Sequence, residues 1–167
     1  MFYTGIRAGE GVNLQLNDID LINKVIYIRN RETFTTKSGK ERMIPLNESA
    51  FDVLKDQFPK VYKINSFSYA FWRVDPKICL TVDYCSKKFK EAVRAAGLDE
   101  NLHLHSLRHS FCSNLVSAGA SLYMVQILAG HSSPNVTKIY SHIANASLVE
   151  AVNLIGKSNL TLLISNK

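Results

Sequence analysis

Residues 129–140 read Ala129-Gly130-His131-Ser132-Ser133-Pro134-Asn135-Val136-Thr137-Lys138-Ile139-Tyr140, and this stretch says most about the fold and chemistry of the chain. A phenol follows an imidazole by nine residues. Pro134 permits a short helix to begin after Gly130, and we expect this helix to carry Tyr140. Taken alone, such a tyrosine is more often a half-buried core residue, because its ring is apolar and its hydroxyl stays in water. Its meaning depends on the polar residues that accompany it.

A second polar cluster lies upstream and reads His105-Ser106-Leu107-Arg108-His109. The first histidine and the arginine are three residues apart on a predicted helix, so both project from one face and can reach a common ligand. His105 and His109 also have the spacing of a metal pair. No acidic residue lies between them as in zinc protease helices, so we expect no metal site. A lone arginine, Arg7, lies near the start of the chain. Two guanidiniums, two imidazoles and a phenol are the side chains needed to attack a phosphodiester without a metal.

The composition predicts one basic globular domain. The 167 residues are 46% hydrophobic, which excludes wholesale disorder and provides for a core. A net charge of +6 favours a polyanionic partner such as nucleic acid. The sequence shows no signal peptide and no membrane-spanning run, and its three cysteines indicate reduced core residues of a cytoplasmic protein.

Hydrophobic periodicity predicts a mostly helical α+β fold. Residues 8–46 indicate a small antiparallel three-stranded sheet, with 17–20 as a turn and a hairpin tip near Lys37 to Lys40. The strand candidates are the apolar positions of 8–16, then 25–28, and the segments 32–36 and 42–46 on either side of the tip. We expect helices at about 47–58, 81–96, 106–118, 121–129, from 134 through Tyr140, and near 145–155, with a further apolar segment at 160–164.

Four segments in order resemble the conserved boxes of the tyrosine recombinases, the phage integrase family. Thr4-Gly5-Ile6-Arg7-Ala8-Gly9-Glu10 resembles the arginine box, and Lys37-Ser38-Gly39-Lys40-Glu41-Arg42-Met43-Ile44-Pro45-Leu46 resembles the β-hairpin with the catalytic lysine. His105-Ser106-Leu107-Arg108-His109-Ser110-Phe111 is similar to the histidine-x-x-arginine box. Gly130-His131-Ser132-Ser133 through Tyr140 resembles the box that ends in the nucleophile. The resemblance implies the DNA breaking-rejoining fold, with residues 1–156 as an N-terminally truncated catalytic domain and 157–167 as a C-terminal tail.

The resemblance also implies roles for individual residues. Tyr140 would attack the scissile phosphate and form a 3′-phosphotyrosyl link, and Arg7 and Arg108 would bind the non-bridging oxygens. Lys37 would protonate the departing 5′-oxygen. His105 would act as a base or as a hydrogen-bonding partner.

The remaining polar residues of the boxes have supporting roles in this prediction. His131 would hydrogen-bond the scissile phosphate. Lys40 competes with Lys37 as the acid and, with Arg42, is predicted to bind DNA. Glu10 would orient Arg7. We assign the other histidines to packing or to the surface: His103, His109 and His142.

The family further implies partners and alternatives. We expect a site-specific recombinase that binds a double-stranded DNA attachment site as a tetramer, is a monomer without DNA, and uses no metal, ATP or other cofactor. A C-terminal tail of this family can dock on a neighbouring protomer, and folding back on its own sheet is the alternative. A type IB topoisomerase is the competing enzyme, and a non-catalytic DNA-binding module is the competing class.

Overall fold

The computed structural model describes residues 1–57 and 68–144, in which short helices surround one small sheet. Its elements in chain order are α1 (Ala8–Val12), η1 (Leu16–Asp18), β1 (Ile19–Asp20), β2 (Val25–Ile28), β3 (Arg42–Pro45), α2 (Glu48–Gln57), α3 (Val82–Ala95), α4 (Ser106–Ser117), α5 (Leu122–Ala129), α6 (Pro134–Lys138) and α7 (Ser141–Ala144). Within the described ranges, no helix has the length and apolarity needed to cross a bilayer.

The sheet is antiparallel with strand order β1-β2-β3, which confirms the predicted three-stranded architecture. Ile26 of β2 pairs with Ile19 on one side and Ile44 on the other. Ile26 and Ile44 are almost completely buried, in a cluster that also holds Ile6 and Leu54. This first core therefore joins the sheet to α2 and to the segment before α1.

The strand positions in the first half of the chain differ from the prediction. Residues 8–12 form α1 instead of a strand, because the Glu10 carboxylate accepts the backbone N–H of Arg7 and begins a helical turn. The predicted turn at 17–20 contains β1, which exists through its pairing with β2. Residues 32–36 form no strand, because Asn30 binds the Thr36 N–H and the Gly39 carbonyl and folds the connection onto itself.

Local capping chemistry sets the helix ends in the second half. The Thr81 and Ser121 hydroxyls accept the N–H groups of Tyr84 and Met124, as expected for residues that begin helices. Gly130 ends α5 in the left-handed conformation, with φ 67° and ψ 43°.

Tyr140 is not part of the helix that begins at Pro134. That helix, α6, ends at Lys138, and Tyr140 lies in the turn that joins it to α7. The Tyr140 N–H donates to the Thr137 carbonyl, three residues back, and this bond closes a tight turn where the helix ends. The predicted helix near 145–155, the apolar segment at 160–164 and the tail 157–167 lie outside the described residues.

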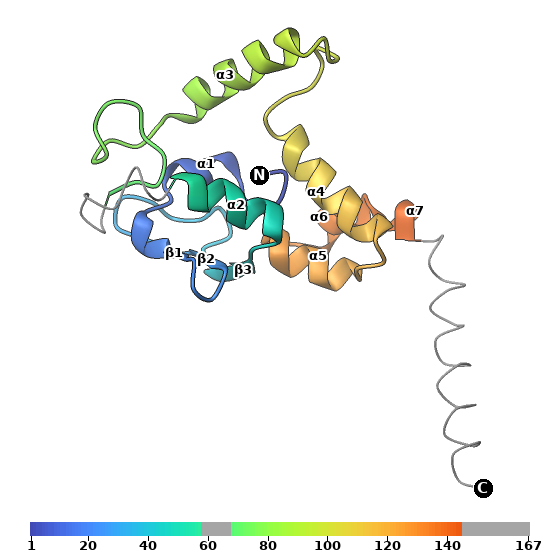
Figure 1. The fold of residues 1–167 in the computed structure, drawn as a ribbon. Coiled ribbons are helices and arrows are strands. Elements are labelled where there is room, and N and C mark those ends of the chain that lie inside the picture. Colours follow the sequence, from blue (N-terminus) through green and yellow to red (C-terminus); the bar gives the residue numbers. More distant parts are fainter. Residues whose placement is uncertain (58–67, 145–167) are drawn as a thin grey trace, which may run out of the picture.

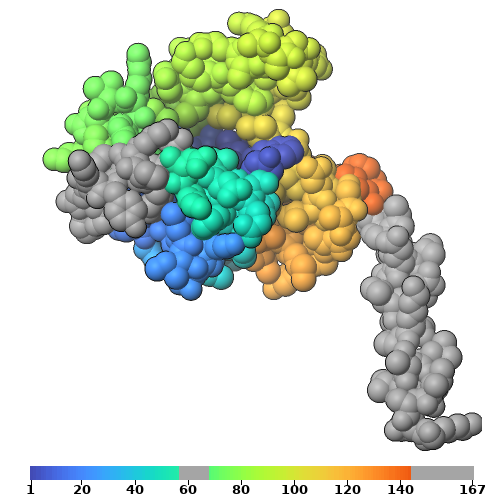
Figure 2. Space-filling model, viewed as in Figure 1, coloured from blue at the N-terminus to red at the C-terminus, as the bar shows by residue number. Residues whose placement is uncertain are grey.

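A second core lies among the C-terminal helices. Phe111, Cys112 and Val116 of α4 pack there with Val125 of α5 and with Tyr140. Figure 1 shows α4 to α7 grouped to the right of the sheet. In the same view α3 runs above α1, on the side of α1 that faces away from the sheet. In Figure 2 the N-terminal residues lie between α2 and α4. The first residues of the chain are thus placed between the two cores.

Candidate active site

Glu10 is the centre of a buried charged network at the start of α1. Its side chain is 2% exposed and accepts hydrogen bonds from two arginines. Arg7 donates from Nη1 over 3.0 Å, and Arg42 donates from Nη1 and Nη2 over 2.9 and 2.7 Å. Burial alone would raise the pKa of Glu10, but the hydrogen bonds and charges of Arg42 and Arg7 outweigh it and lower the pKa. The carboxylate therefore stays ionised and holds both guanidiniums, as predicted for Glu10 with respect to Arg7.

Arg7 also reaches across the molecule to the end of α5. Its Nη2 donates to the Gly130 carbonyl over 2.6 Å, between residues 123 apart in the chain. Gly130 needs to be a glycine for two reasons, since its φ is positive and an added Cβ would lie 2.7 Å from Nη1 of Arg42. Arg42 itself donates from Nε to the Leu128 carbonyl. The first box, the third strand and the end of α5 are thereby joined at one point.

Arg108 is the second guanidinium of the site. It is 3% exposed, and its Nη1 donates over 2.5 Å to the carbonyl of Gly5, two residues before Arg7. Gly5 has φ 63°, and a Cβ there would collide with the Phe111 ring, so this close approach requires glycine. Burial and then the charge of Arg7 lower the pKa of Arg108 to about 10, which leaves the guanidinium charged at neutral pH. The two guanidiniums thus lie close enough for the charge of Arg7 to act on Arg108.

His131 follows Gly130 directly and lies beside these arginines. Its Nδ1 is 2.8 Å from Oγ1 of the buried Thr137, with which it shares a hydrogen bond. Burial, followed by the charges of Arg108 and Arg7, lowers the pKa of His131 to about 4. The imidazole is therefore neutral at neutral pH, which suits a hydrogen-bonding group more than a charged one.

Tyr140 points inward and contacts a histidine that the sequence-based prediction left out. The Tyr140 hydroxyl lies 2.6 Å from Nδ1 of His109, and Tyr140 as a whole is 5% exposed. The ring of His105 packs edge-on against His109, with centroids 4.9 Å apart. Burial and the Cys112 thiol raise the pKa of Tyr140, and the charge of Arg108 opposes this. In this arrangement the phenol is protonated.

Lys37 and Lys40 lie on the exposed turn between β2 and β3. The turn is closed by a hydrogen bond from the Gly39 N–H to the Thr36 carbonyl over 2.9 Å. The positive charge of Lys37 contributes to a lowered pKa of His105, after burial and after the charges of His109, Arg108 and Arg7. A cavity of about 280 Å³ separates this turn from α5, and Lys40, Arg42 and His131 line it. The turn thus faces the arginine and histidine cluster.

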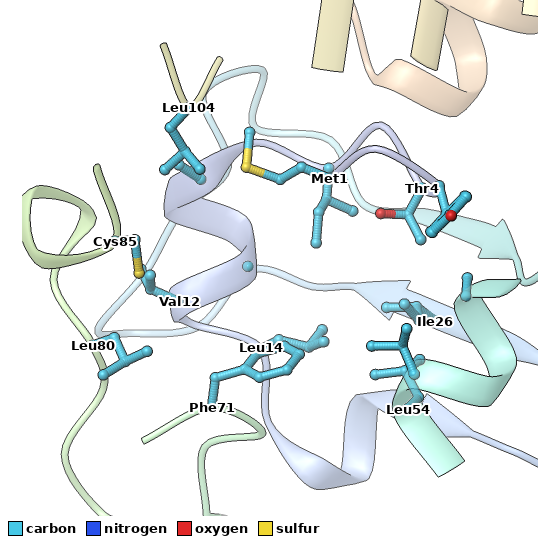
Figure 3. A pocket seen from close by; sticks show the side chains of 16 residues that line it. Met1, Thr4, Val12, Leu14, Ile26, Leu54, Phe71, Leu80, Cys85 and Leu104 are labelled. Atoms are coloured by element: carbon cyan, nitrogen blue, oxygen red, sulfur yellow. The ribbon is translucent and has the colours of Figure 1, made fainter. Parts of the chain in front are cut away.

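A larger cavity of about 320 Å³ lies elsewhere, between α1, α2 and the start of α3. Figure 3 shows its apolar side chains, including Val12, Leu14, Leu54 and Phe71. None of the predicted site residues lines it. The chemistry of the site is therefore separate from this cavity.

Comparison with known proteins identifies the family. The family model for the phage integrase family matches residues 1–147. This chain belongs to the phage integrase family. A relative in this family, tyrosine recombinase XerD of Lacticaseibacillus casei, is 32% identical over 161 residues, which cover 89% of this chain and 50% of XerD.

Solved structures of phage integrase family members share the fold. The crystal structure of XerA recombinase has a TM-score of 0.72 at 25% identity and covers 91% of this chain and 54% of its own. XerH site-specific recombinase, in a pre-cleavage complex with its difH substrate, has a TM-score of 0.69 at 28% identity. The match covers 90% of this chain and 43% of the XerH chain. The chain thus spans about half the length of the relatives it matches.

The structure brings most of the predicted site residues into one cluster. Arg7, Arg108, His131 and Tyr140 gather there from four separate segments, and His105 joins them through His109. Lys37 and Lys40 stay on the facing turn. Arg42 is different, because its side chain is 7% exposed and already paired with Glu10. That position favours a supporting role over the predicted contact with DNA.

Proposed function

We propose that this chain is the part of a site-specific recombinase that cleaves and rejoins DNA through a 3′-phosphotyrosyl intermediate at Tyr140. The observation that carries the proposal is the convergence of the half-buried Arg7 and the buried Arg108 with His131 and Tyr140 in a chain of the phage integrase family. The recombinases among its relatives favour strand exchange over topoisomerase-like relaxation or DNA binding alone.

The two arginines act on the phosphate. Negative charge grows on the non-bridging oxygens when phosphorus becomes five-coordinate, and a planar guanidinium can donate two parallel hydrogen bonds to them. Arg7 and Arg108 each use part of their donors on backbone carbonyls, which fixes their orientation before DNA arrives. Loss of either should cost on the order of 3 kcal/mol of barrier, by analogy with the loss of one oxyanion donor.

The remaining steps use the histidines and the β2–β3 turn. His131, neutral because its pKa is about 4, donates or accepts a hydrogen bond at the phosphate. Lys37 protonates the departing 5′-oxygen, and the exposed turn lets its side chain reach the DNA; Lys40 is the alternative acid and a phosphate contact. The reaction needs no ATP, because the phosphotyrosyl link retains the energy of the broken bond and a 5′-hydroxyl can reverse it. The two arginines supply the positive charge that a metal ion would otherwise provide.

The partner in this proposal is a double-stranded attachment site. A solved structure holds the relative XerH bound to its difH substrate, and the net charge of +6 suits a DNA ligand for this chain. We propose a monomer without DNA and a tetramer on it, with residues 1–156 as the catalytic unit and 157–167 as a C-terminal tail.

Covalent trapping tests the proposal. A pool of nicked duplexes with a randomised centre is incubated with the chain, so that cleavage next to the nick releases a short strand and leaves the protein attached. The wild type should yield an adduct on a subset of sequences, and Tyr140→Phe should yield none. Tyr27→Phe is the matched control, because it removes a hydroxyl from a ring on β2 that stacks with Arg29. An adduct that persists in Tyr140→Phe, or no wild-type adduct with any duplex, would refute the proposal for this chain.

A further inference from the structure

His109 has an unexpected position for a histidine assigned to the surface. It follows Arg108 on α4, and its Nδ1 lies 2.6 Å from the Tyr140 hydroxyl, 31 residues along the chain. The two rings are tilted by 46° with centroids 6.1 Å apart. His109 is an exposed residue while Tyr140 is buried, so the contact lies where the helix meets the surface. This histidine directly touches the atom that would attack DNA.

The contact has a defined chemical direction. A neutral imidazole has one donor and one acceptor nitrogen, and a phenol is the stronger donor of the pair. With Nδ1 as acceptor and the proton on Nε2, the hydroxyl donates to His109. When the phenol attacks phosphorus it loses this proton, and Nδ1 is already at the distance for proton transfer.

The other candidate bases are engaged elsewhere in the described structure. His131 shares its Nδ1 with Thr137. His105 packs against the His109 ring, and its hydrogen bonds within the described ranges do not include Tyr140. The Cys112 thiol lies against Tyr140, and burial raises the pKa of Cys112, so the thiol keeps its own proton and cannot take that of Tyr140.

The charged groups around His109 come from three elements. Arg108 belongs to α4, His105 directly precedes this helix, Arg7 precedes α1, and His131 follows α5. Arg108 places positive charge close to the Tyr140 hydroxyl. This charge favours the phenolate that forms when the proton leaves.

We propose that His109 is a catalytic residue, the base that accepts the Tyr140 proton. This inference rests on the proposed recombinase function. In the forward step the Tyr140 O–H proton moves to Nδ1 of His109, the phenolic oxygen bonds to phosphorus, and the bond from phosphorus to the 5′-oxygen breaks. The leaving oxygen takes a proton from Lys37. In the reverse step the 5′-hydroxyl attacks, its proton returns to Lys37, and the phenol recovers its proton from His109. His105 then has the second of its predicted roles, that of a hydrogen-bonding partner.

The His109→Asn variant tests the proposal most sharply. The asparagine amide can occupy the place of Nδ1 and accept the phenol hydrogen bond, but it cannot take up a proton at neutral pH. With duplexes that the wild type cleaves, at saturating protein, adduct formation should slow by about 10²-fold or more. His103→Asn makes the same change at an exposed histidine before α4 and should leave the rate unaltered.

A second substrate separates the base from the acid. A duplex with sulfur in place of the bridging 5′-oxygen has a leaving group that needs no proton. Lys37→Ala should be slow on the oxygen substrate and fast on the sulfur substrate, whereas His109→Asn should be slow on both. The dependence of the rate on pH should differ between the wild type and His109→Asn. A purely structural role would not change the pH profile.

Several outcomes would overturn the inference. A His109→Asn rate within a few-fold of wild type would limit His109 to holding the ring, and a His109→Ala rate above wild type would make the contact a restraint on Tyr140. Nitrogen NMR of labelled histidine gives a test without catalysis, because the His109 Nδ1 signal should move in Tyr140→Phe. An unchanged signal would remove the contact itself. Absence of a wild-type adduct, by contrast, refutes the proposed function and is recognised before any His109 variant is compared.

Discussion

Replacing Glu10 by glutamine keeps the size of the side chain and removes its charge. The wild-type carboxylate accepts four hydrogen bonds, one from the Arg7 backbone, one from the Arg7 side chain and two from Arg42. A glutamine offers one acceptor oxygen, and its amide nitrogen would face a guanidinium donor. Arg42 and Arg108, with exposures of 7% and 3%, would also lose the negative charge nearest to them.

The expected cost follows from the burial of the pair. Removing one partner of a buried ion pair costs about 3–5 kcal/mol, because the other charge is left without compensation. Glutamine retains part of the hydrogen bonding, so we expect Glu10→Gln to lower the free energy of unfolding by about 3 kcal/mol. For a chain of this length that corresponds to a Tm lower by about 6–12 °C.

Urea unfolding followed by circular dichroism measures this cost. Glu48→Gln is the matched control, because Glu48 pairs with Lys24 on the surface and is 77% exposed; its loss should change stability by less than about 1 kcal/mol. The pKa of Glu10 is lowered in the folded state, so its stabilisation is complete above the unfolded pKa and disappears as the pH falls through the folded pKa. The gap between wild type and Glu10→Gln should therefore shrink in acid. A gap as small as that of Glu48→Gln, or one that is independent of pH, would refute the buried network.

Three further predictions concern backbone, protonation and DNA. Gly130→Ala should destabilise the chain by about 1–3 kcal/mol. Gly119→Ala is the control in the same urea assay and should cost less. Both glycines have a positive φ, but of the two only Gly130 would bring its Cβ against another side chain, that of Arg42. Proton NMR should show His131 titrating near pH 4, so that its signal is constant through the neutral range, and a midpoint near the ordinary imidazole value would contradict its burial beside the arginines. The logarithm of the affinity for non-specific duplex should fall linearly with the logarithm of salt concentration, and replacing both Lys37 and Lys40 by alanine should reduce the slope by about 0.9 per lost phosphate contact; an unchanged slope would mean that this turn does not touch the backbone.

Local chemistry made the helices of the second half predictable. A side-chain oxygen at Thr81 or Ser121 and a glycine at 130 act within one turn of chain, so no knowledge of the rest of the fold is needed. The first half depends on distant partners. β1 is two residues long and exists because β2 pairs with it, and α1 begins through a carboxylate that two arginines hold ionised.

Among the site residues, too, some positions were predictable from the sequence and others depended on distant partners. The types and order of Arg7, Arg108 and His131 were sufficient to predict the residues that the fold brings together. The burial of Arg42 was not predictable, since a hairpin arginine is ordinarily solvated and its partner lies 32 residues away. The role of His109 had one available signal, its place four residues after His105 on the same helical face, but its contact with Tyr140 depends on how the α6–α7 turn packs.

The network of Glu10, Arg7, Arg42 and Gly130 also bears on how such sequences can diverge. A substitution at Glu10 changes the cost of every substitution at Arg42, and a side chain at Gly130 is compatible only with a smaller residue at position 42. Single steps away from this set therefore pass through unstable intermediates, while concerted changes do not. This epistasis should keep the four positions together in descendants that function, and it should let them change as a group in copies that have lost activity.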